Sequence, residues 1–365
     1  MRVVVDAIPV VPFGGYAVTF EGLLSGWDRL GTDDEIHVLL AEGAEHELPD
    51  SVEVHRFRVG SPQIVRRVLV QSRAARRVCR AVGADALLAA VPTTAVVPVG
   101  CPKVITVHDL RHELLPGQFS RGRRLIRKLS YGIGYRQAAG VICISERTRK
   151  DLLRRHSGLR SKPVFTVRWA ADHVDAWPRP ESRSGERPYA LAFGHFPNKA
   201  AERAIEAWAI LRERGEARPL VIVGLPAADR ERILERIRDA GLQELVTPLP
   251  WLDADEFRAR FASAGLIVFP SDFEGFGLPA VEAMRLGIPL VVSADEALRE
   301  VTGGNATVET GRDPASLADA VSVAWATPPE SLERARAQVD RTWEDVARQT
   351  RDALAQVIEA RSRRS

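Results

Sequence analysis

The segment Pro270–Ser293, PSDFEGFGLPAVEAMRLGIPLVVS, decides the fold of the C-terminal half of this chain. It follows a short β-branched run and ends on another, LVVS. Between them, Pro279 suits the first turn of a helix, where its missing N–H costs nothing, and Gly287 with Pro289 ends that helix. The segment therefore predicts a strand, a loop, a short helix over 279–286 and a second strand.

Two glutamates, Glu274 and Glu282, bracket the glycine-rich part of this segment. In doubly wound domains, ligands bind outside the carboxyl ends of the strands, where this loop is expected. Gly275 and Gly277 allow a close backbone approach, and the N–H groups of the helix start favour an anion such as a diphosphate. The two carboxylates suit the hydroxyls of a nucleotide sugar. In the alternative interpretation, Glu282 only complements the helix dipole and Glu274 is a solvated loop residue. The spacing of the two glutamates alone does not decide between these interpretations.

The same alternation of short apolar runs and amphipathic stretches extends over the whole chain, which predicts βαβ units and parallel sheets. Strands are expected in RVVVDAI, EIHVLLA, ADALLAA, KVITVHD, GVICIS, VFTVRW, YALAFG, PLVIVG, LVTPLP, GLIVFPS and PLVVS. Helices are expected over 19–29, 63–81, 123–138, 200–214, 228–240, 254–264 and 279–286. The fold class is therefore α/β, with two Rossmann-like doubly wound domains over 1–176 and 189–342. A polar linker over 177–188 joins them, and a helix over 343–365 returns to the first domain.

Composition excludes several other classes of protein. The 365 residues carry 51 basic and 48 acidic side chains, a net charge of +3 that is too balanced for nucleic acid as the main partner. The longest apolar run, 86–101, is broken by two prolines and is too short to cross a bilayer. Met1 leads directly into an apolar strand, so no signal peptide is expected. The three cysteines are far apart in sequence, which favours a reducing cytoplasm over a disulfide framework or a metal site.

With its surroundings, EGFGLPAVE (274–282) resembles the E-x7-E motif of the retaining family 4 glycosyltransferases, which have the GT-B fold. The blocks VITVHDL (104–110), ICISERTRKDLL (142–153) and YALAFGHFPNKAAERAIEAW (189–208) are similar to blocks of that family, in the same order. The resemblance covers most of the chain. It implies two domains facing each other across a cleft, with the acceptor on the N-terminal side and a nucleotide-sugar donor on the C-terminal side.

The resemblance also implies roles for the motif residues. Glu282 is expected to bind the ribose hydroxyls, and Glu274 is expected to contact the transferred sugar. Sugar and phosphates would be held by the backbone amides of Gly275, Phe276, Gly277 and Leu278.

The block after YALAF corresponds to the place where the family puts an arginine and a lysine against the diphosphate. Lys199 fits the lysine, and it is the only lysine after Lys162 in a chain with five, which favours a functional role over a solvated helix start. His195 stands where arginine is frequent, and Ala200 where asparagine is common. A neutral His195 removes one charge from the leaving-group site, whereas a protonated one replaces it. Trp251 or its backbone is expected near the base.

In the first domain, Gly14 and Gly15 match the family's glycine loop beneath the donor phosphates; an ordinary tight turn is the alternative. His108 is expected near the transferred sugar, with Asp109 beside it on the acceptor side. The H-x3-H spacing of His108 and His112 does not indicate a metal, because the stretch is strand and loop rather than one helix face. Asp253–Asp255 imitates a D-x-D metal motif but is better explained as a helix cap.

A basic amphipathic stretch, 121–137, is compatible with a peripheral contact to an anionic membrane. A solvated helix face is the more ordinary explanation. The basic residues concerned are Arg121, Arg123, Arg124, Arg127 and Lys128.

Together these observations predict transfer of a hexose-type sugar from a nucleotide diphosphate sugar to an acceptor hydroxyl, with retention and without a metal or further cofactor. No enzymic nucleophile is evident, so the leaving phosphate is expected to accept the acceptor's proton. A lipid-linked or polysaccharide intermediate and a small natural product are the candidate acceptors. A nucleotide-sugar epimerase of the same fold and a non-catalytic nucleotide-sugar-binding protein remain alternatives.

Overall fold

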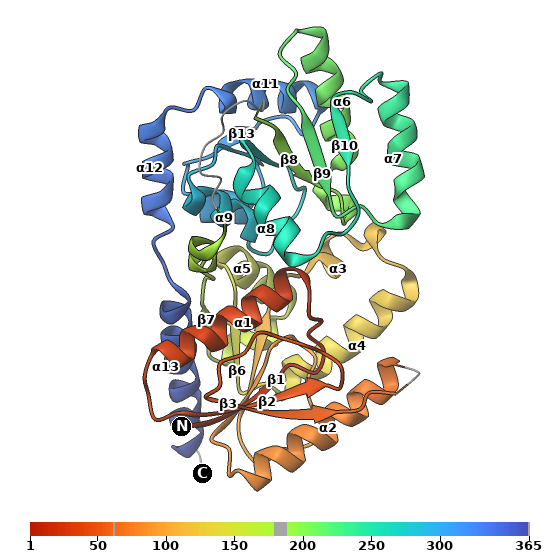
Figure 1. The fold of residues 1–365 in the computed structure, drawn as a ribbon. Coiled ribbons are helices and arrows are strands. Elements are labelled where there is room, and N and C mark those ends of the chain that lie inside the picture. Colours follow the sequence, from red (N-terminus) through yellow and green to blue (C-terminus); the bar gives the residue numbers. More distant parts are fainter. Residues whose placement is uncertain (61–62, 179–187, 364–365) are drawn as a thin grey trace. The chain divides into compact units, whose positions relative to one another are not determined.

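The computed structural model describes residues 1–60, 63–178 and 188–363. Contacts divide the chain into two compact units (Figure 1). Unit 1 comprises Met1–Ala170 with Arg341–Ser365, and unit 2 comprises Ala171–Asp340. Among the described residues, none of the helices combines the length and the apolar character that a bilayer span requires.

Unit 1 is built on a seven-stranded sheet in the order β3-β2-β1-β4-β5-β6-β7, and every neighbouring pair is parallel. The strands are β1 (Arg2–Asp6), β2 (Glu35–Ala41), β3 (Val52–Phe57), β4 (Ala86–Ala89), β5 (Lys103–Val107), β6 (Gly140–Cys143) and β7 (Val164–Thr166). Its helices are α1 (Gly14–Arg29), α2 (Gln63–Ala81), α3 (Arg111–Leu114), α4 (Arg121–Gln137), α5 (Glu146–Arg155) and α13 (Trp343–Ser362), with short 3-10 turns η1 (Pro116–Gln118) and η2 (Ser157–Ser161).

Both faces of this sheet are covered, which explains why its central strands are apolar without alternation. Successive side chains of a strand point to opposite faces. In β1, Val3 and Val5 therefore enter a core with α1 and α13, whereas Val4 enters a second core with α2.

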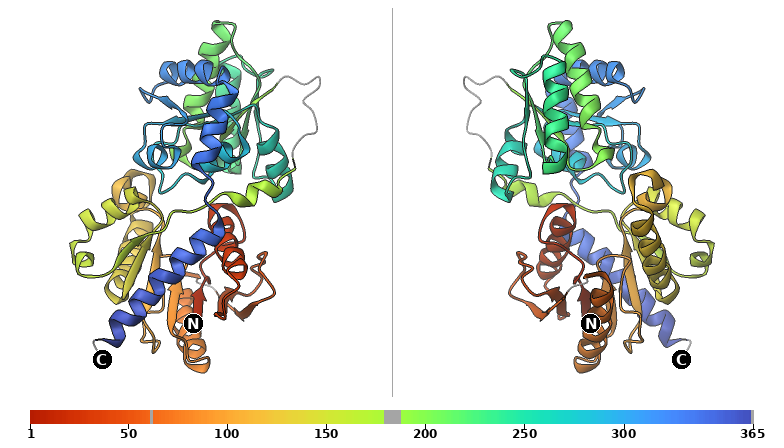
Figure 2. Two further views of the ribbon diagram at one scale, coloured as in Figure 1. Left: turned by 90° about the vertical axis from the view of Figure 1, so that its left-hand side faces the viewer. Right: turned by 90° about the vertical axis from the view of Figure 1, so that its right-hand side faces the viewer.

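The last helix, α13, belongs to unit 1 and packs against α1 (Figure 2). Two glycines of α1 make this close approach possible. A Cβ on Gly22 would lie 2.4 Å from Cε2 of Trp343, and one on Gly26 would lie 2.1 Å from the Trp343 carbonyl oxygen. At the same end of the unit, Asp34 accepts hydrogen bonds from Arg351 of α13 (2.7 Å) and from the N-terminal amine (2.6 Å).

Unit 2 has a six-stranded parallel sheet in the order β10-β9-β8-β11-β12-β13. The strands are β8 (Ala190–Phe193), β9 (Leu220–Val223), β10 (Val246–Pro248), β11 (Leu266–Phe269), β12 (Leu290–Ser293) and β13 (Thr307–Glu309). The helices are α6 (Ala201–Glu213), α7 (Ala227–Asp239), α8 (Ala254–Ser263), α9 (Leu278–Leu286), α10 (Glu296–Thr302), α11 (Pro314–Trp325) and α12 (Pro329–Gln338), with 3-10 turns η3 (Asp172–Ala176) and η4 (Pro197–Lys199).

The strand order reverses once in each sheet, between β1 and β4 in unit 1 and between β8 and β11 in unit 2. At such a switch point the loops after the two central strands run in opposite directions and leave a crevice for a ligand. The topology therefore selects the loops after β8 and β11 as the place to examine in unit 2.

The prediction of two doubly wound α/β domains is confirmed. The sequence missed β3, β13 and the helices α3, α5, α10, α11 and α12. The polar β3 forms the sheet edge and β13 has three residues, so neither shows a continuous apolar run. The expected boundary after 176 is six residues too late, because η3 bonds within unit 2. Within the expected linker, 179–187 lie outside the described residues.

All three cysteines are free and buried. Cys79 at the end of α2 and Cys101 before β5 are 22 positions apart in sequence but lie side by side in the α2 core. The hydrogen bond with Cys101, together with burial, raises the pKa of the Cys79 thiol.

Candidate active site

The structure has the predicted order of elements: the strand β11 precedes the quoted segment, which then forms the loop 270–277, the helix α9 and the second strand β12. Gly277 caps α9 with φ +97°, a left-handed conformation that side chains rarely adopt. A Cβ at Gly277 would also lie 2.4 Å from Cδ2 of Leu298. Glycine is thus required here both by the backbone and by the packing of α10 under the loop.

Glu274 and Lys199 meet at this loop, although 75 positions separate them. Lys199 ends η4, which follows β8 at the switch point, and its Nζ donates to Oε1 of Glu274 at 2.5 Å. The lysine side chain is 8% exposed and that of Glu274 is 14% exposed. The ammonium also lies 4.3 Å from the ring centroid of Phe269 at the end of β11. The structure therefore places an oriented, largely buried cation at the edge of the glycine-rich loop.

Asn198 fastens η4 to the loop, a role that the sequence did not indicate. Its Nδ2 donates to Oγ of Ser271 and to the carbonyl oxygen of Phe273, both at 3.0 Å. The backbone carbonyl oxygen of Asn198 accepts a hydrogen bond from the backbone N–H of Asp272 at 2.8 Å. Asn198 is 1% exposed, so these bonds are shielded from water and hold Lys199 in register with Glu274.

Arg203 of α6 fixes the other side of the loop. Its guanidinium donates to Oδ1 of Asp272 at 3.0 Å and to the carbonyl oxygen of Pro270. Its Nε lies 3.1 Å from Oε1 of the fully buried Glu309, close enough for an ion pair but not aligned as a hydrogen bond. Burial raises the pKa of Glu309 to about 7, against the opposing effect of the Arg203 cation. Because these residues are scattered over three elements, no sequence motif joins them.

Glu282, in the first half of α9, is a buried carboxylate rather than a residue on a solvated helix face. Its side chain is 5% exposed, and its Oε1 lies 3.0 Å from Nε2 of His173. His173 comes from η3, which a second contact also ties to α9: Arg285 donates to Asp175 at 2.6 Å. The ring of His173 packs edge-on against Trp177 at 5.8 Å between centroids. The sequence did not identify His173.

His195 and Trp251 lie together at the carboxyl ends of β8 and β10. Their ring centroids are 5.7 Å apart, and Phe196 lies 4.8 Å from His195. Gly224, after β9, separates them: a Cβ there would lie 3.3 Å from Cβ of His195 and 3.6 Å from Cε3 of Trp251. Phe196 and Trp251 are about half exposed. The two residues that the sequence proposed near the nucleotide are thus neighbours on an open aromatic patch.

Within the glycine-rich loop, Phe276 and Leu278 have buried side chains, 4% and 9% exposed. Their side chains are therefore largely out of reach of a ligand. The expectation that the amides of Gly275, Phe276, Gly277 and Leu278 hold phosphates stays a prediction.

In unit 1, Gly14 and Gly15 do not form a loop: they begin α1, after Phe13 at the cap. Gly14 has φ +73°, so the chain needs glycine to enter the helix. A Cβ at Gly15 would meet nothing within 4 Å, so protein packing does not explain that glycine. The expected helix start at 19 was wrong by more than a turn because glycines lower helix propensity.

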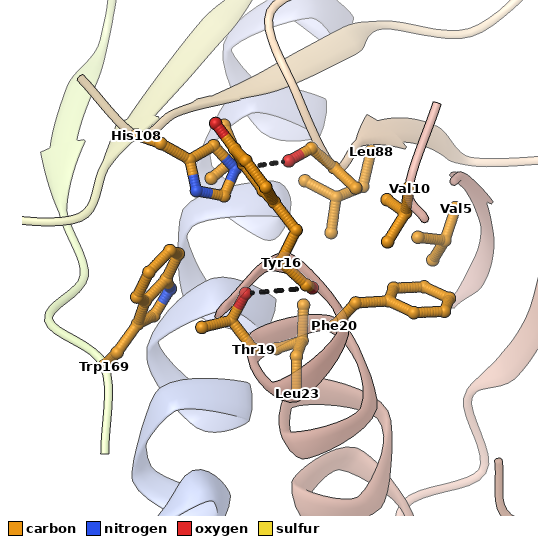
Figure 3. Close-up of a pocket in the computed structure, with 11 residues that line it drawn as sticks. Val5, Val10, Tyr16, Thr19, Phe20, Leu23, Leu88, His108 and Trp169 are labelled. Atoms are coloured by element: carbon orange, nitrogen blue, oxygen red, sulfur yellow. Dashed lines mark hydrogen bonds between the residues drawn. The ribbon is translucent and has the colours of Figure 1, made fainter. Parts of the chain in front are cut away.

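His108 is buried at the end of β5 and lines a small cavity of about 30 Å³ together with Tyr16 and Trp169 (Figure 3). Its ring centroid lies 4.5 Å from that of Tyr16 and 5.0 Å from that of Trp169. Nε2 donates to the carbonyl oxygen of Ala90 at 2.7 Å, so Nε2 carries the proton. Burial lowers the pKa of His108 to about 4, which keeps the ring neutral near pH 7. This volume is about that of one water molecule in the liquid.

Asp109 follows His108 and is half-buried. Its Oδ1 accepts from the backbone N–H of Arg111 at 2.8 Å, which closes a turn. The prediction for Asp253 is confirmed: its side chain caps α8 by accepting from the N–H of Glu256 at 2.8 Å.

Ala200 shows why asparagine is common at this position in the family that the sequence resembles. It caps α6 with φ +57° and ψ +40°, a left-handed conformation that asparagine tolerates better than alanine. We expect Ala200→Asn to stabilise unit 2 by about 1 kcal/mol and to raise its Tm by about 2–4 °C. Differential scanning calorimetry measures this. Ala201→Asn, one position into α6, is the control and should not raise Tm.

Two family models match the chain in succession. Residues 13–172 match the model described as Glycosyltransferase Family 4, and residues 174–340 match the model described as Glycosyl transferases group 1. The chain belongs to the family 4 glycosyltransferases. This confirms the resemblance to family 4, whereas the E-x7-E motif and retention stay predictions. The second model covers the residues of the Lys199–Glu274 pair and Glu282.

Comparisons of this family 4 chain with individual proteins agree with the two family models. The MMP alpha-(1->4)-mannosyltransferase of Mycolicibacterium hassiacum is 32% identical over 217 residues, 56% of this chain and 51% of that protein. The chain thus matches only about half the length of this relative. Sucrose-phosphate synthase from Thermosynechococcus elongatus superposes with a TM-score of 0.75 at 18% identity, over 99% of this chain and 100% of that one. Anabaena HepE, solved in complex with UDP and glucose, superposes with a TM-score of 0.72 at 20% identity, over 98% of this chain and 100% of that one. These neighbours establish the GT-B type of fold.

Proposed function

We propose that the chain transfers a hexose-type sugar from a nucleotide diphosphate sugar to an acceptor hydroxyl, with retention at the anomeric carbon. Unit 2 binds the donor, and unit 1 supplies the acceptor side with His108 and Asp109. The observation that carries this proposal is the Lys199–Glu274 pair at the switch point of unit 2.

The pair suits a reaction in which a diphosphate leaves. As the bond between the anomeric carbon and the diphosphate oxygen breaks, negative charge grows on that oxygen. A preformed, poorly solvated ammonium stabilises it without reorganisation. Lys199 is already held by Glu274 and Phe269, so it meets both requirements. Glu274 also accepts hydrogen bonds from hydroxyls of the transferred sugar.

The acceptor oxygen forms the new bond on the face that the diphosphate leaves, and its proton passes to a phosphate oxygen of the departing nucleoside diphosphate. Atoms and charge balance without an enzymic base or a metal ion. His108 is neutral near pH 7, because burial holds its pKa near 4, so it serves as a hydrogen-bonding group and not as a general acid.

A panel of labelled UDP-, GDP-, ADP- and dTDP-sugars tests the proposal, with nucleotide release and sugar products followed together. Transfer, or slow hydrolysis with nucleotide release, is the expected result. Isomerisation of the sugar without release would instead identify an epimerase, and binding without any turnover would identify a non-catalytic protein. The anomeric configuration of the product, measured by NMR, decides between retention and inversion.

His173 is a positioning residue for Glu282 in this proposal, because its ring orients the carboxylate that binds the ribose. We expect His173→Ala to raise KM for the donor about tenfold, with a smaller change in kcat, since one hydrogen bond to a charged group is lost. His173→Gln, which retains an N–H donor, should recover most of the affinity.

The control for His173 is His156→Ala in unit 1, since His156 also lies 3.0 Å from a glutamate, Glu113. It should leave KM for the donor unchanged. An equal rise in KM in the Gln and Ala variants would contradict the positioning role.

We further propose that α4 contacts an anionic membrane that presents the acceptor. The structure adds an exposed apolar stripe to the basic residues of this helix, which contains no acidic residue. The stripe consists of Leu125, Ile126, Leu129 and Ile133, each 39–60% exposed. An apolar face flanked by arginines is the composition that binds at an interface.

Leu125→Asp with Leu129→Asp is expected to lower co-sedimentation with phosphatidylglycerol vesicles at least about fivefold. Val323→Asp replaces an equally exposed apolar residue, 63% exposed, on α11 of unit 2 and should have no effect. If the parent chain sediments equally with phosphatidylcholine and phosphatidylglycerol vesicles, the anionic contact is wrong.

A further inference from the structure

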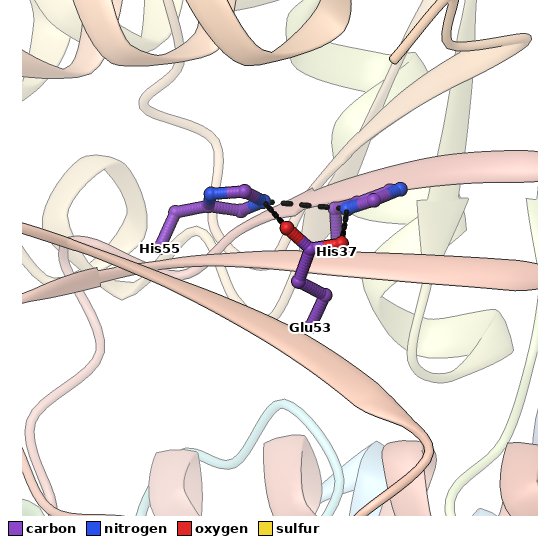
Figure 4. Close-up of side chains that lie close together, drawn as sticks. All are labelled: His37, Glu53 and His55. Carbon is purple, nitrogen blue, oxygen red and sulfur yellow. Dashed lines mark hydrogen bonds and ion pairs between the residues drawn. The ribbon is translucent and has the colours of Figure 1, made fainter.

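Two histidines and a glutamate meet on β2 and β3, far along the chain from every residue of the proposed active site. His37 of β2 is paired in register with Glu53 of β3, and Leu39 with His55. Glu53 and His55 are two residues apart on one strand, so their side chains leave the same face of the sheet. Figure 4 shows the three side chains converging on one point.

The distances between their donor atoms are nearly equal. Nδ1 of His37 lies 3.3 Å from Nε2 of His55 and 3.2 Å from Oε2 of Glu53, and Nε2 of His55 lies 3.5 Å from Oε1 of Glu53. A zinc ion with bonds of about 2.0–2.1 Å in tetrahedral geometry separates its ligand atoms by about 3.3–3.4 Å. The two contacts of Glu53 end at different carboxylate oxygens, so one of them would reach an ion held by the two imidazoles after a small rotation of the exposed Glu53 side chain.

The donor set and its exposure also suit an ion. Two imidazoles and one carboxylate are ligands that zinc uses in sites with an open fourth position. The His37 side chain is 8% exposed, His55 24% and Glu53 63%, so the site is anchored on the buried side and open to water on the other. The positive charge of Arg77 near His55 disfavours a bound cation, whereas the negative charge of the Glu53 carboxylate favours one.

We propose that His37, Glu53 and His55 bind one divalent transition-metal ion of the zinc type, with water as the fourth ligand. Among the residues that the structure describes, the edge strand β3 pairs only with β2. An ion held by both strands would fasten that edge, and its binding to the folded state alone would raise the stability of unit 1. This inference is independent of the proposed sugar transfer.

The test uses the full chain without a histidine tag, after treatment with a chelator and dialysis. Titration calorimetry with ZnCl2 should show about one ion per chain, and Zn²⁺ should raise Tm. Co²⁺ in place of Zn²⁺ should give the intense visible absorption of a four-coordinate site. His55→Ala and Glu53→Gln should each weaken Zn²⁺ binding more than about tenfold.

Glu35→Gln is the matched control for Glu53→Gln, because Glu35 is a similarly exposed glutamate at the start of β2 (56% against 63%). It should bind Zn²⁺ like the parent. The proposal is overturned if the parent binds no Zn²⁺, or if His55→Ala and Glu53→Gln both bind it as tightly as the parent. Circular dichroism of each variant shows whether a loss of binding reflects unfolding, and a folded His55→Ala or Glu53→Gln variant that still gives the Co²⁺ spectrum of the parent also overturns it.

Discussion

Lys199→Met is expected to lower kcat for sugar transfer by about 10²–10³-fold, the range found when a single preorganised group at a developing charge is removed. The lysine is 8% exposed, held between Glu274 and the ring of Phe269, and thus oriented before the donor binds. Steady-state kinetics with the donor that the panel identifies measure this effect. Lys150→Met removes an exposed lysine of α5 in unit 1 and should transfer at the parent rate.

Removing only the lysine leaves Glu274 without its cation, so a loss of stability must be separated from a loss of chemistry. Lys199→Met combined with Glu274→Gln removes both charges. We expect this double variant to regain Tm relative to Lys199→Met but not to regain transfer. If Lys199→Met transfers sugar as fast as the parent, the leaving-group role assigned to this residue is wrong.

Gly277→Ala is expected to have the largest effect on stability, about 2–4 kcal/mol of unfolding free energy in unit 2. Two causes add at this position. Alanine is strained at φ +97°, and its Cβ would lie 2.4 Å from Cδ2 of Leu298, so α10 or the loop must shift. Because the loop carries Glu274, donor affinity should fall as well. A urea titration measures the loss of unfolding free energy in unit 2, and hydrogen exchange of the α9 amides measures the local loss of stability in α9.

Gly287→Ala at the other end of α9 separates these causes. Gly287 also has a positive φ, +67°, but its Cβ would meet nothing within 4 Å. We expect a loss of only about 1 kcal/mol there. Equal losses in the two variants would show that backbone strain alone matters, and that the contact with Leu298 adds nothing.

The loop, its lysine and the residues that hold them form the proposed donor site. Two residues that are not neighbours in sequence, Asn198 of η4 and Arg203 of α6, hold the loop that carries Glu274. Because several buried hydrogen bonds hold the loop, its shape is set before a ligand arrives. Preorganisation of this kind is what electrostatic stabilisation of a leaving group requires.

The sequence by itself determined the fold class and the motif. Apolar runs such as LIVF and LVIV, separated by helices of ordinary length, are enough to predict parallel sheets, because a strand covered on both faces carries no polar alternation. Local chemistry likewise placed α9, since Pro279 and Gly287 act on the residues next to them. The rarity of lysine in the chain drew attention to Lys199. The sequence did not predict the edge strand β3, because VEVHRF contains polar residues and is only partly buried.

Only the tertiary structure decided which partners these residues have. The sequence separates His173 from Glu282 by 109 positions, Arg203 from Glu309 by 106 and His37 from His55 by 18. Strand register brings the two histidines together, and the packing of turns and helices brings the other two pairs together; neither is encoded by a residue's immediate neighbours. The burial that lowers the pKa of His108 and raises that of Glu309 is also a property of the assembled core. Local sequence sets backbone conformation over a few residues, whereas contacts and pKa values depend on what the fold places around each side chain.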